Sequence, residues 1–263
     1  MLPPILCYHK VDTRFELGFT QLEPRVFQRQ VEALARQGYR ALSGAELLAA
    51  ALDTGPAPER TVAFTFDDGY AALADQALPV LADHGFAALV FVITDFVGAE
   101  NSWDVQYGWR AFRHLSWEAL GRWRERGIET HAHGATHARL TWLTDQQAAD
   151  ELGRAREAIT TRLGCEPDGI SYPFGAVDDR VRALASDAGY RLGFAGPNSA
   201  RPGDPLRLER LPVYGWDRFA VPLVLRHGAA GGFARALARF TNRCAVGTAV
   251  IQRALGRRYR RSR

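Results

Sequence analysis

The sequence predicts an α/β fold in which parallel strands alternate with helices, as a sheet that is open or closed into a barrel. Short apolar runs alternate with amphipathic, helix-like stretches along residues 4–195. The 263 residues are 47% hydrophobic, which is enough for one sizeable core, most comfortably in an α/β barrel. Only 24% of the residues are charged, which argues against gross disorder.

Six strands are expected, and each is an apolar run of the kind that lies buried in a parallel sheet. They cover residues 4–8, 62–66, 88–93, 128–133, 169–172 and 191–195. The run at 128–133 is the one of mixed polarity. In parallel α/β folds, chemistry gathers beyond the carboxyl ends of the strands, so the residues that follow these runs are the candidates for a site.

Helices are expected between the strands; three of the five have a start signal, and four end at a glycine. Pro24 begins the first helix at its first position, and Gly38 ends it. A helix after the second strand carries Leu73, Ala77 and Leu81 and ends at Gly85. Three further helices are expected. One runs from Ser116 to Gly127, one begins at the capping box of Thr144 with Gln147 and ends at Gly164, and one runs from Val181 to Ala188. Residues 94–115 form a long aromatic-rich loop, a candidate wall or lid.

Cysteine usage and the amino terminus favour the cytoplasm. Cys7, Cys165 and Cys244 are an odd number without paired spacing, so a reducing compartment fits better than a disulfide framework. The first residues have neither a basic region nor a long apolar region, and no apolar run reaches the length of a membrane span. A cytoplasmic protein is expected, with peripheral contact with the inner face of the membrane as an addition.

The charge is distributed unevenly between the body and the tail. From Arg218 onward there are eleven arginines and no acidic residue, so a net charge of +4 leaves −7 for residues 1–217. We expect a catalytic domain over residues 1–232 and a basic, helix-capable tail over 233–263. The tail either lies on anionic lipid or packs on the barrel with a disordered basic end. Since no nucleic-acid-binding motif is present, no nucleic acid partner is expected.

Two clusters of ligand-type residues follow expected strands. Asp67 and Asp68 place two like charges at the end of a buried run, which is costly unless something compensates for the repulsion. His133 and His137 are spaced i, i+4, so on one turn or a tight loop both imidazoles face one point. A divalent cation held by one aspartate and both histidines would offset the repulsion. Each cluster alone suits a solvated turn, but together they favour a site; the nearby His131 suits packing or a supporting role.

The segments TFDDGY, HGATHARL and ISYPFG, in this order and within residues 62–175, make the chain resemble the polysaccharide deacetylases of carbohydrate esterase family 4, which carry the NodB homology domain. The ILCYHKV start and the later strand pattern extend the resemblance to about residue 215. This start is similar to the branch of poly-N-acetylglucosamine deacetylases, in which the motif order is circularly permuted. The resemblance implies a distorted (β/α)7 barrel and a metal-dependent hydrolase that removes acetyl groups from sugars.

The resemblance also implies roles for individual residues. Asp67 corresponds to the general base, and Asp68, His133 and His137 to the metal ligands. The third motif implies a groove wall of Tyr172, Pro173 and Phe174, with the backbone N–H of Phe174 at the oxyanion.

Other positions depart from the family pattern or leave a choice. Many members have an arginine that orients the base where this chain has Ser171, so the sequence leaves open what sets the pKa of Asp67. His9 is the expected general acid of the permuted branch, and His227 is the alternative. Asp104 in the aromatic loop is a candidate for substrate contact, or simply a solvated loop residue.

The expected activity is hydrolysis of an acetyl group, in first place N-acetyl, from an amino-sugar glycan or a lipid-linked sugar. The expected cofactor is a divalent metal, zinc in first place, with Ni²⁺, Co²⁺ and Fe²⁺ as alternatives. A hypothesis from another class is a non-catalytic carbohydrate-binding relative of the deacetylases. The departure at Ser171 favours that second hypothesis slightly, and the intact Asp67, Asp68, His133 and His137 disfavour it.

Overall fold

A computed structural model of the chain describes residues 2–14, 20–53, 55, 58–101 and 112–213. Its main sheet has the strand order β10-β9-β8-β7-β6-β5-β1-β11, with β4 added beside β5, and every pairing is parallel. The strands are β1 (Ile5–Tyr8), β4 (Arg40–Ala41), β5 (Thr61–Phe66), β6 (Ala88–Val92), β7 (Ile128–Ala132), β8 (Gly169–Ser171), β9 (Leu192–Ala195), β10 (Leu208–Glu209) and β11 (Leu211–Pro212). A separate pair joins β2 (Lys10–Val11) and β3 (Gln21–Leu22).

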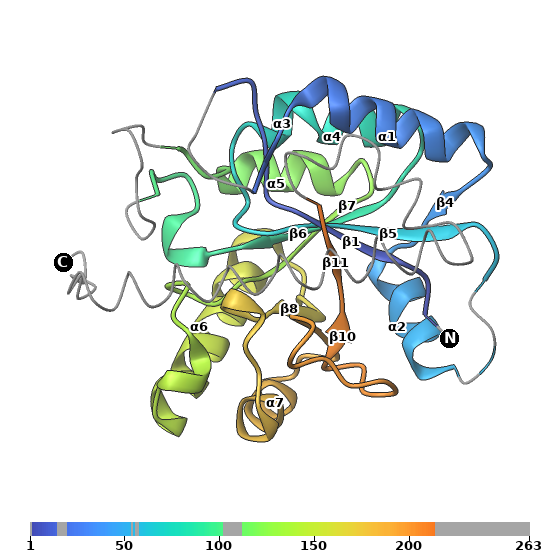
Figure 1. Ribbon diagram of the computed structural model, residues 1–263. Coiled ribbons are helices and arrows are strands. Elements are labelled where there is room, and N and C mark those ends of the chain that lie inside the picture. The colour runs from blue at the N-terminus through green and yellow to red at the C-terminus, as the bar shows by residue number, and fades with distance from the viewer. Residues whose placement is uncertain (1, 15–19, 54, 56–57, 102–111, 214–263) are drawn as a thin grey trace.

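One short segment nearly closes the sheet into a barrel. Strands β10 and β11 are separated only by Arg210, and β10 pairs with β9 while β11 pairs with β1. The segment therefore bridges the two edges of the sheet, and it crosses the middle of Figure 1 in orange. If this segment is counted once, seven strand positions surround the barrel, which confirms the (β/α)7 architecture implied by the resemblance.

The helices cover the outside of the barrel. In Figure 1, α1, α3, α4 and α5 lie on one side of the strands, and α6 and α7 lie on the other. Their bounds are α1 (Pro24–Arg36), α2 (Gly44–Leu52), α3 (Leu73–Gln76), α4 (Leu78–Asp83), α5 (Trp117–Arg124), α6 (Asp145–Leu163) and α7 (Asp179–Asp187), with single 3₁₀ turns η1 (Thr94–Phe96), η2 (Leu140–Trp142) and η3 (Pro173–Gly175). Among them, α1, α5, α6 and α7 match the expected helices.

Two helices differ from the expectation. The single helix expected after β5 is divided at Ala77, because Pro79 lies in the first turn of α4 and its ring cannot follow an unbroken helix. Helix α2 was not expected, although Ser43 and Glu46 form a complete capping box at its start. Its Leu47 is fully buried against the strands, so α2 covers one end of the barrel.

The buried side chains form two clusters. The larger one lies between the strands and the outer helices. The smaller one, here called the inner cluster, fills the barrel itself and consists of Ile5, Leu42, Leu47, Ala63, Leu89, Phe91, Leu192, Phe194 and Leu208. Because side chains alternate along a strand, the residues that continue these inward rows beyond the apolar layer also face the interior.

Within the described residues, no helix combines the length and the apolar character that crossing a membrane requires. The boundary expected at 232/233 and the basic tail of residues 233–263 lie outside those residues and stay predictions.

Replacing Gly193 of β9 by alanine is expected to destabilise the fold by about 2 kcal/mol or more, because the closing segment passes too close for a side chain. A Cβ at Gly193 would lie 2.2 Å from the carbonyl oxygen of Leu206 and 2.8 Å from the hydroxyl of Tyr172. The control is Gly153→Ala in α6, where a Cβ meets nothing within 4 Å and helix propensity predicts a gain of about 0.5–1 kcal/mol. Urea unfolding measures both changes; equal stability of the two variants would contradict the tight closure.

Candidate active site

Polar side chains gather inside the barrel where the parallel strands end. The inner cluster fills the other half of the interior with apolar side chains. The residues at the strand ends are His9 after β1, Asp67 after β5, His133 after β7, Ser171 in β8 and Arg210 between β10 and β11. They come from strands far apart in the sequence, and the barrel brings them to one mouth.

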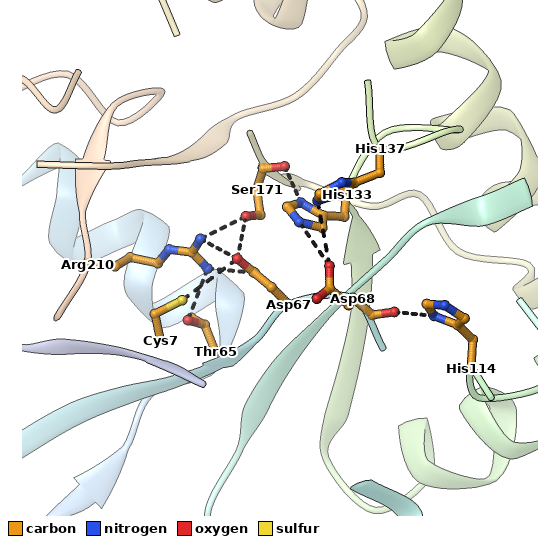
Figure 2. Close-up of polar contacts among 9 residues, drawn as sticks. All are labelled: Cys7, Thr65, Asp67, Asp68, His114, His133, His137, Ser171 and Arg210. Carbon is orange, nitrogen blue, oxygen red and sulfur yellow. Dashed lines mark hydrogen bonds and ion pairs between the residues drawn. The ribbon is translucent and has the colours of Figure 1, made fainter. Parts of the chain in front are cut away.

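Asp68, His133 and His137 converge into one buried group. The Oδ1 atom of Asp68 lies 3.5 Å from Nε2 of His133 and 3.7 Å from Nε2 of His137. The side chains are only 8%, 3% and 8% exposed, respectively. Figure 2 shows both imidazoles directed at the Asp68 carboxylate. The two imidazoles, spaced i, i+4, therefore face one point, as expected, and they lie on a loop rather than on a helical turn.

Hydrogen bonds and burial set the tautomer and the protonation state of the two histidines. Nδ1 of His133 lies 2.7 Å from the carbonyl oxygen of Ser171, and since a carbonyl can only accept, this nitrogen donates and Nε2 carries the lone pair. Burial lowers the pKa of His133 and lowers that of His137 well below its ordinary value. Nδ1 of His114 donates to the backbone carbonyl of Asp68 at 2.6 Å and steadies the loop from the other side.

Left-handed backbone marks the same place. Among the described residues other than glycine, positive φ angles occur at Arg60, Asp68, His137 and Phe174, with values of 50°, 67°, 63° and 60°. Three of these four belong to the site. Each costs about 1–2 kcal/mol for a residue with a side chain, so the surrounding contacts must hold them there. Such strain is typical of residues whose direction matters for function.

The donor set fits a divalent cation. Two neutral imidazoles and one carboxylate on one face form the 2-His-1-carboxylate arrangement that leaves positions open for water and substrate. The separations of 3.5 and 3.7 Å exceed ordinary hydrogen-bond lengths. They are close to the spacing of neighbouring ligands that each bind one zinc ion at about 2.0–2.2 Å. The residues present therefore match a metal centre formed by Asp68, His133 and His137.

Asp67 has a different environment from its neighbour. Arg210 donates from Nη1 to Oδ1 at 2.8 Å and from Nη2 to Oδ2 at 2.6 Å, a bidentate pair with both side chains at most 7% exposed. The hydroxyl of Ser171 donates to Oδ2 at 3.2 Å and accepts from Arg210 at 2.8 Å. Arg210 also contacts Thr65 Oγ1 at 3.3 Å, as Figure 2 shows.

The electrostatics of this pair keep the carboxylate ionised. Burial raises the pKa of Asp67, but the charge of Arg210 and its hydrogen bonds lower it more, so the pKa lies below its ordinary value. The pair contributes stability that is present above the unfolded-state pKa of about 3.9 and is lost as the pH falls below it. At neutral pH, Asp67 is therefore a carboxylate able to accept a proton.

Arg210 is the residue that sequence analysis missed. Ser171 in β8 has a small side chain that leaves space for the guanidinium of Arg210 beside Asp67. Arg210 comes from the closing segment and lies with its Cζ 5.7 Å from the ring centroid of Phe91 and 5.6 Å from that of Phe194. The signal in the sequence is the alternation of leucine with charged residues over residues 206–209, which is typical of one more strand and leads directly to Arg210.

His9 lies beside Asp67. Ligand-type atoms of Cys7, His9 and Asp67 all lie within 4.8 Å of one another. This second group suits a cation poorly, because both oxygens of Asp67 already accept hydrogen bonds from the positive Arg210. Burial lowers the pKa of His9 to about 4, with the Asp67 charge opposing it, so the imidazole is neutral at pH 7. Burial also raises the pKa of Cys7, so its thiol stays protonated.

The third motif contributes less than expected to the surface of the site. Tyr172 is fully buried in the larger core cluster, so its side chain does not line the groove wall that the resemblance implies. Pro173 is also buried, at the start of η3. Phe174 is partly exposed, and its ring centroid lies 4.8 Å from that of His137. It is the member of this motif that borders the metal ligands.

Three further residues were singled out by the sequence. Asp104 and His227 lie outside the described residues, so their roles stay predictions. His131 lies in the barrel below His133, where its Nε2 contacts Glu129 at 3.1 Å and its Nδ1 accepts from the N–H of Gly169 at 3.2 Å. This placement gives His131 a packing role, apart from the cation ligands.

Comparison with known proteins gives a consistent family. The family model for polysaccharide deacetylase matches residues 54–193. The Bacillus subtilis protein YxkH, named for the same family, is 27% identical over 190 residues, which cover 72% of this chain and 63% of YxkH. The poly-β-1,6-N-acetyl-D-glucosamine N-deacetylase of Staphylococcus aureus is 25% identical over 150 residues, which cover 54% of this chain and 49% of that enzyme. The matched region thus spans less than two thirds of these relatives.

Solved structures share the fold. The structure of IcaB from Ammonifex degensii aligns with a TM-score of 0.71 at 23% identity and covers 90% of this chain and 96% of that one. The Streptococcus pyogenes deacetylase PplD, solved in complex with acetate, aligns with a TM-score of 0.71 at 21% identity and covers 81% and 93%. Since the family model also matches more than half of the residues, the chain belongs to the polysaccharide deacetylase family.

Proposed function

We propose that the chain is a metal-dependent hydrolase that removes an acetyl group, in first place N-acetyl, from an amino-sugar glycan or glycolipid. The observation that carries the proposal is the separation of the two adjacent carboxylates. Asp68 is directed at two imidazoles, and Asp67 is bound by Arg210. One carboxylate is thereby suited to a cation and the other to a proton, which are the two requirements of hydrolysis at an acetyl carbonyl.

Asp68, His133 and His137 would hold the cation, zinc in first place, with Ni²⁺, Co²⁺ and Fe²⁺ as alternatives. Such a cation would lower the pKa of a water ligand toward ~7 and polarise the acetyl carbonyl. Asp67 takes the proton of the attacking water. Arg210 and Ser171 fix the carboxylate so that it accepts this proton without rearranging.

Proton delivery to the leaving amine is assigned to His9. Because His9 is neutral at pH 7, it must gain a proton during the reaction. Because Arg210 lowers the pKa of Asp67, a proton that Asp67 has accepted is passed on to the neighbouring imidazole of His9. His9 then donates it to the sugar nitrogen as the C–N bond breaks. The backbone N–H of Phe174 is proposed to bind the oxygen that becomes negative.

The substrate class is supported by the relatives. The Staphylococcus aureus relative acts, by its name, on poly-β-1,6-N-acetyl-D-glucosamine. The test is acetate release from N-acetylglucosamine oligomers by purified protein whose metal content has been measured. Bound metal with acetate release supports the proposal. Binding of the oligomer without acetate release, at full metal content, would support a non-catalytic carbohydrate-binding relative instead.

His9→Ala is expected to reduce the rate of acetate release by about 10²–10³, while metal content is unchanged, because the leaving amine loses its proton donor. A substrate with a better leaving group, such as an O-acetyl ester, should be affected less. Rates for both substrates, measured beside His227→Ala, check this assignment. Near-normal activity of His9→Ala together with a large loss in His227→Ala would assign the acid to His227.

A further inference from the structure

The loop that carries both histidines is held by a carboxylate from helix α6. Glu151 is 7% exposed, and its Oε2 accepts hydrogen bonds from the backbone N–H groups of Ala135 at 3.1 Å and Thr136 at 2.9 Å. Its Oε1 accepts from the hydroxyl of Thr136 at 2.7 Å. Both oxygens are thus engaged by the residues that lie between His133 and His137.

The other side of the same loop is held by η1. The N–H of Thr94 donates to the carbonyl of Gly134 at 3.3 Å, and the N–H of Asp95 donates to that of Ala135 at 3.0 Å. The Asp95 carboxylate in turn accepts from Nη2 of Arg154 at 2.9 Å with each oxygen, and Arg154 lies on α6 three residues after Glu151. The loop is therefore hydrogen-bonded to Glu151 of α6 on one side and to η1 on the other, and the ion pair of Arg154 with Asp95 links α6 to η1.

The hydrogen bonds with Glu151 and η1 hold a loop whose backbone is left-handed at two positions. His137 has a φ of 63° and Gly134 a φ of 76°, so the loop makes two left-handed steps in four residues. Left-handed backbone at a residue with a side chain persists only where surrounding contacts hold it. Glu151 supplies three of those contacts, and none of them reaches the imidazoles themselves.

We propose that Glu151 is a positioning residue for the cation: it holds the loop so that Nε2 of His137 faces Asp68, and it thereby sets metal affinity. The inference rests on the metal site of the proposed function and adds a determinant of its occupancy. Glu151 is not a ligand, because its oxygens already bind the loop. Outer partners of this kind typically change metal affinity by about 10–100-fold when removed.

The test measures the affinity of the full chain for Zn²⁺ by competition with a chromophoric chelator. Glu151→Ala is expected to weaken zinc binding by about 10–100-fold. Glu151→Gln keeps an oxygen for the backbone N–H groups and an amide that can donate to Thr136, so it is expected to lie between Ala and wild type. The matched control is Glu157→Ala, an exposed glutamate on the same helix, which should leave the affinity unchanged.

Further variants separate positioning from folding. Circular dichroism and urea unfolding identify any variant that does not fold, and Thr136→Val, which removes one hydrogen bond of the set, provides a milder change with a smaller expected loss of affinity. Excess zinc should restore acetate release in Glu151→Ala, because the catalytic groups are intact. Folded Glu151→Ala with zinc affinity within about twofold of wild type would overturn the inference.

His137→Ala distinguishes this failure from a failure of the proposed function. If His137→Ala loses zinc and Glu151→Ala does not, the metal site stands and only the inference fails. If neither variant changes zinc affinity, the assigned ligands are wrong, and the inference is overturned with them. Zinc binding as predicted without acetate release from the oligomers would leave the role of Glu151 supported and contradict the deacetylase activity.

Discussion

Asp67→Asn is expected to lower the rate of acetate release by about 10³–10⁴ while metal content remains at the wild-type level. An amide cannot take a proton from water, and general bases contribute rate factors of this order. Asn has the same shape, and its oxygen can still accept from Arg210, so the barrel mouth is preserved. Acetate release and metal analysis on the same preparation check both parts of the expectation.

The adjacent residue provides the matched comparison. Asp68→Asn is expected to lose both metal and activity, because its carboxylate lies 3.5 and 3.7 Å from the two imidazole nitrogens. The two variants make the same chemical change one residue apart, so their difference isolates proton transfer from metal binding. More than about a tenth of wild-type activity in Asp67→Asn would assign the base elsewhere. Loss of metal in Asp67→Asn would contradict the separation of the two carboxylates.

Asp67→Asn should also cost stability, since Arg210 then remains charged and buried without a carboxylate. Breaking a buried pair by removal of one partner costs about 3–5 kcal/mol. Urea unfolding at neutral pH, compared with the wild type, measures this loss. A stable but inactive Asp67→Asn would show that the pair contributes to orientation more than to folding.

The strands and long helices were predictable because each has a local cause. The apolar runs at residues 62–66 and 88–93 have no alternative to burial, and the capping box at Thr144 fixes where α6 begins. Barrel closure was not predictable in this way. The closing segment has only two residues in each of β10 and β11, and its pairing depends on strands at opposite ends of the sequence.

The residues of the site differ in the same way: some have a local signal in the sequence, and others depend on contacts between distant segments. Asp67, Asp68, His133 and His137 follow strong strand signals, and their spacing in sequence already indicates a shared function. Arg210 has no motif, since its partner is 143 residues away and only closure of the barrel brings them together. Glu151 was likewise hidden in the buried stripe of an ordinary amphipathic helix. The sequence thus shows the groups that react more readily than the groups that hold them.

Arg210→Met is expected to reduce kcat/KM at pH 7 by about 10²-fold, although Arg210 is proposed to touch neither metal nor substrate. Methionine fills the space between the rings of Phe91 and Phe194 but leaves Asp67 buried without its counter-charge. The matched control is Arg201→Met in the loop between β9 and β10; the Arg201 side chain is 60% exposed in its ion pair with Asp179, so its loss should matter little. Arg210→Lys retains the charge without the bidentate geometry, so an intermediate loss is expected.

The pH dependence separates positioning from general damage. In the wild type, Arg210 keeps the pKa of Asp67 below its ordinary value, so the base is ionised at neutral and mildly acidic pH. In Arg210→Met the charge and the hydrogen bonds of Arg210 are lost, while the Ser171 hydroxyl still donates to Asp67, so burial raises the pKa of Asp67 and the base becomes protonated at mildly acidic pH. The rate of Arg210→Met should therefore rise with pH as its Asp67 ionises. In the wild type, Asp67 is already ionised over the same pH range and causes no such rise. The stability of Arg210→Met should change in the opposite direction to its rate. Its free energy of unfolding should fall as the pH rises above about 4, because a buried carboxylate without a counter-charge must then ionise. A uniform loss of rate at every pH would contradict this account, since damage to the fold would reduce the rate without displacing the titration of Asp67.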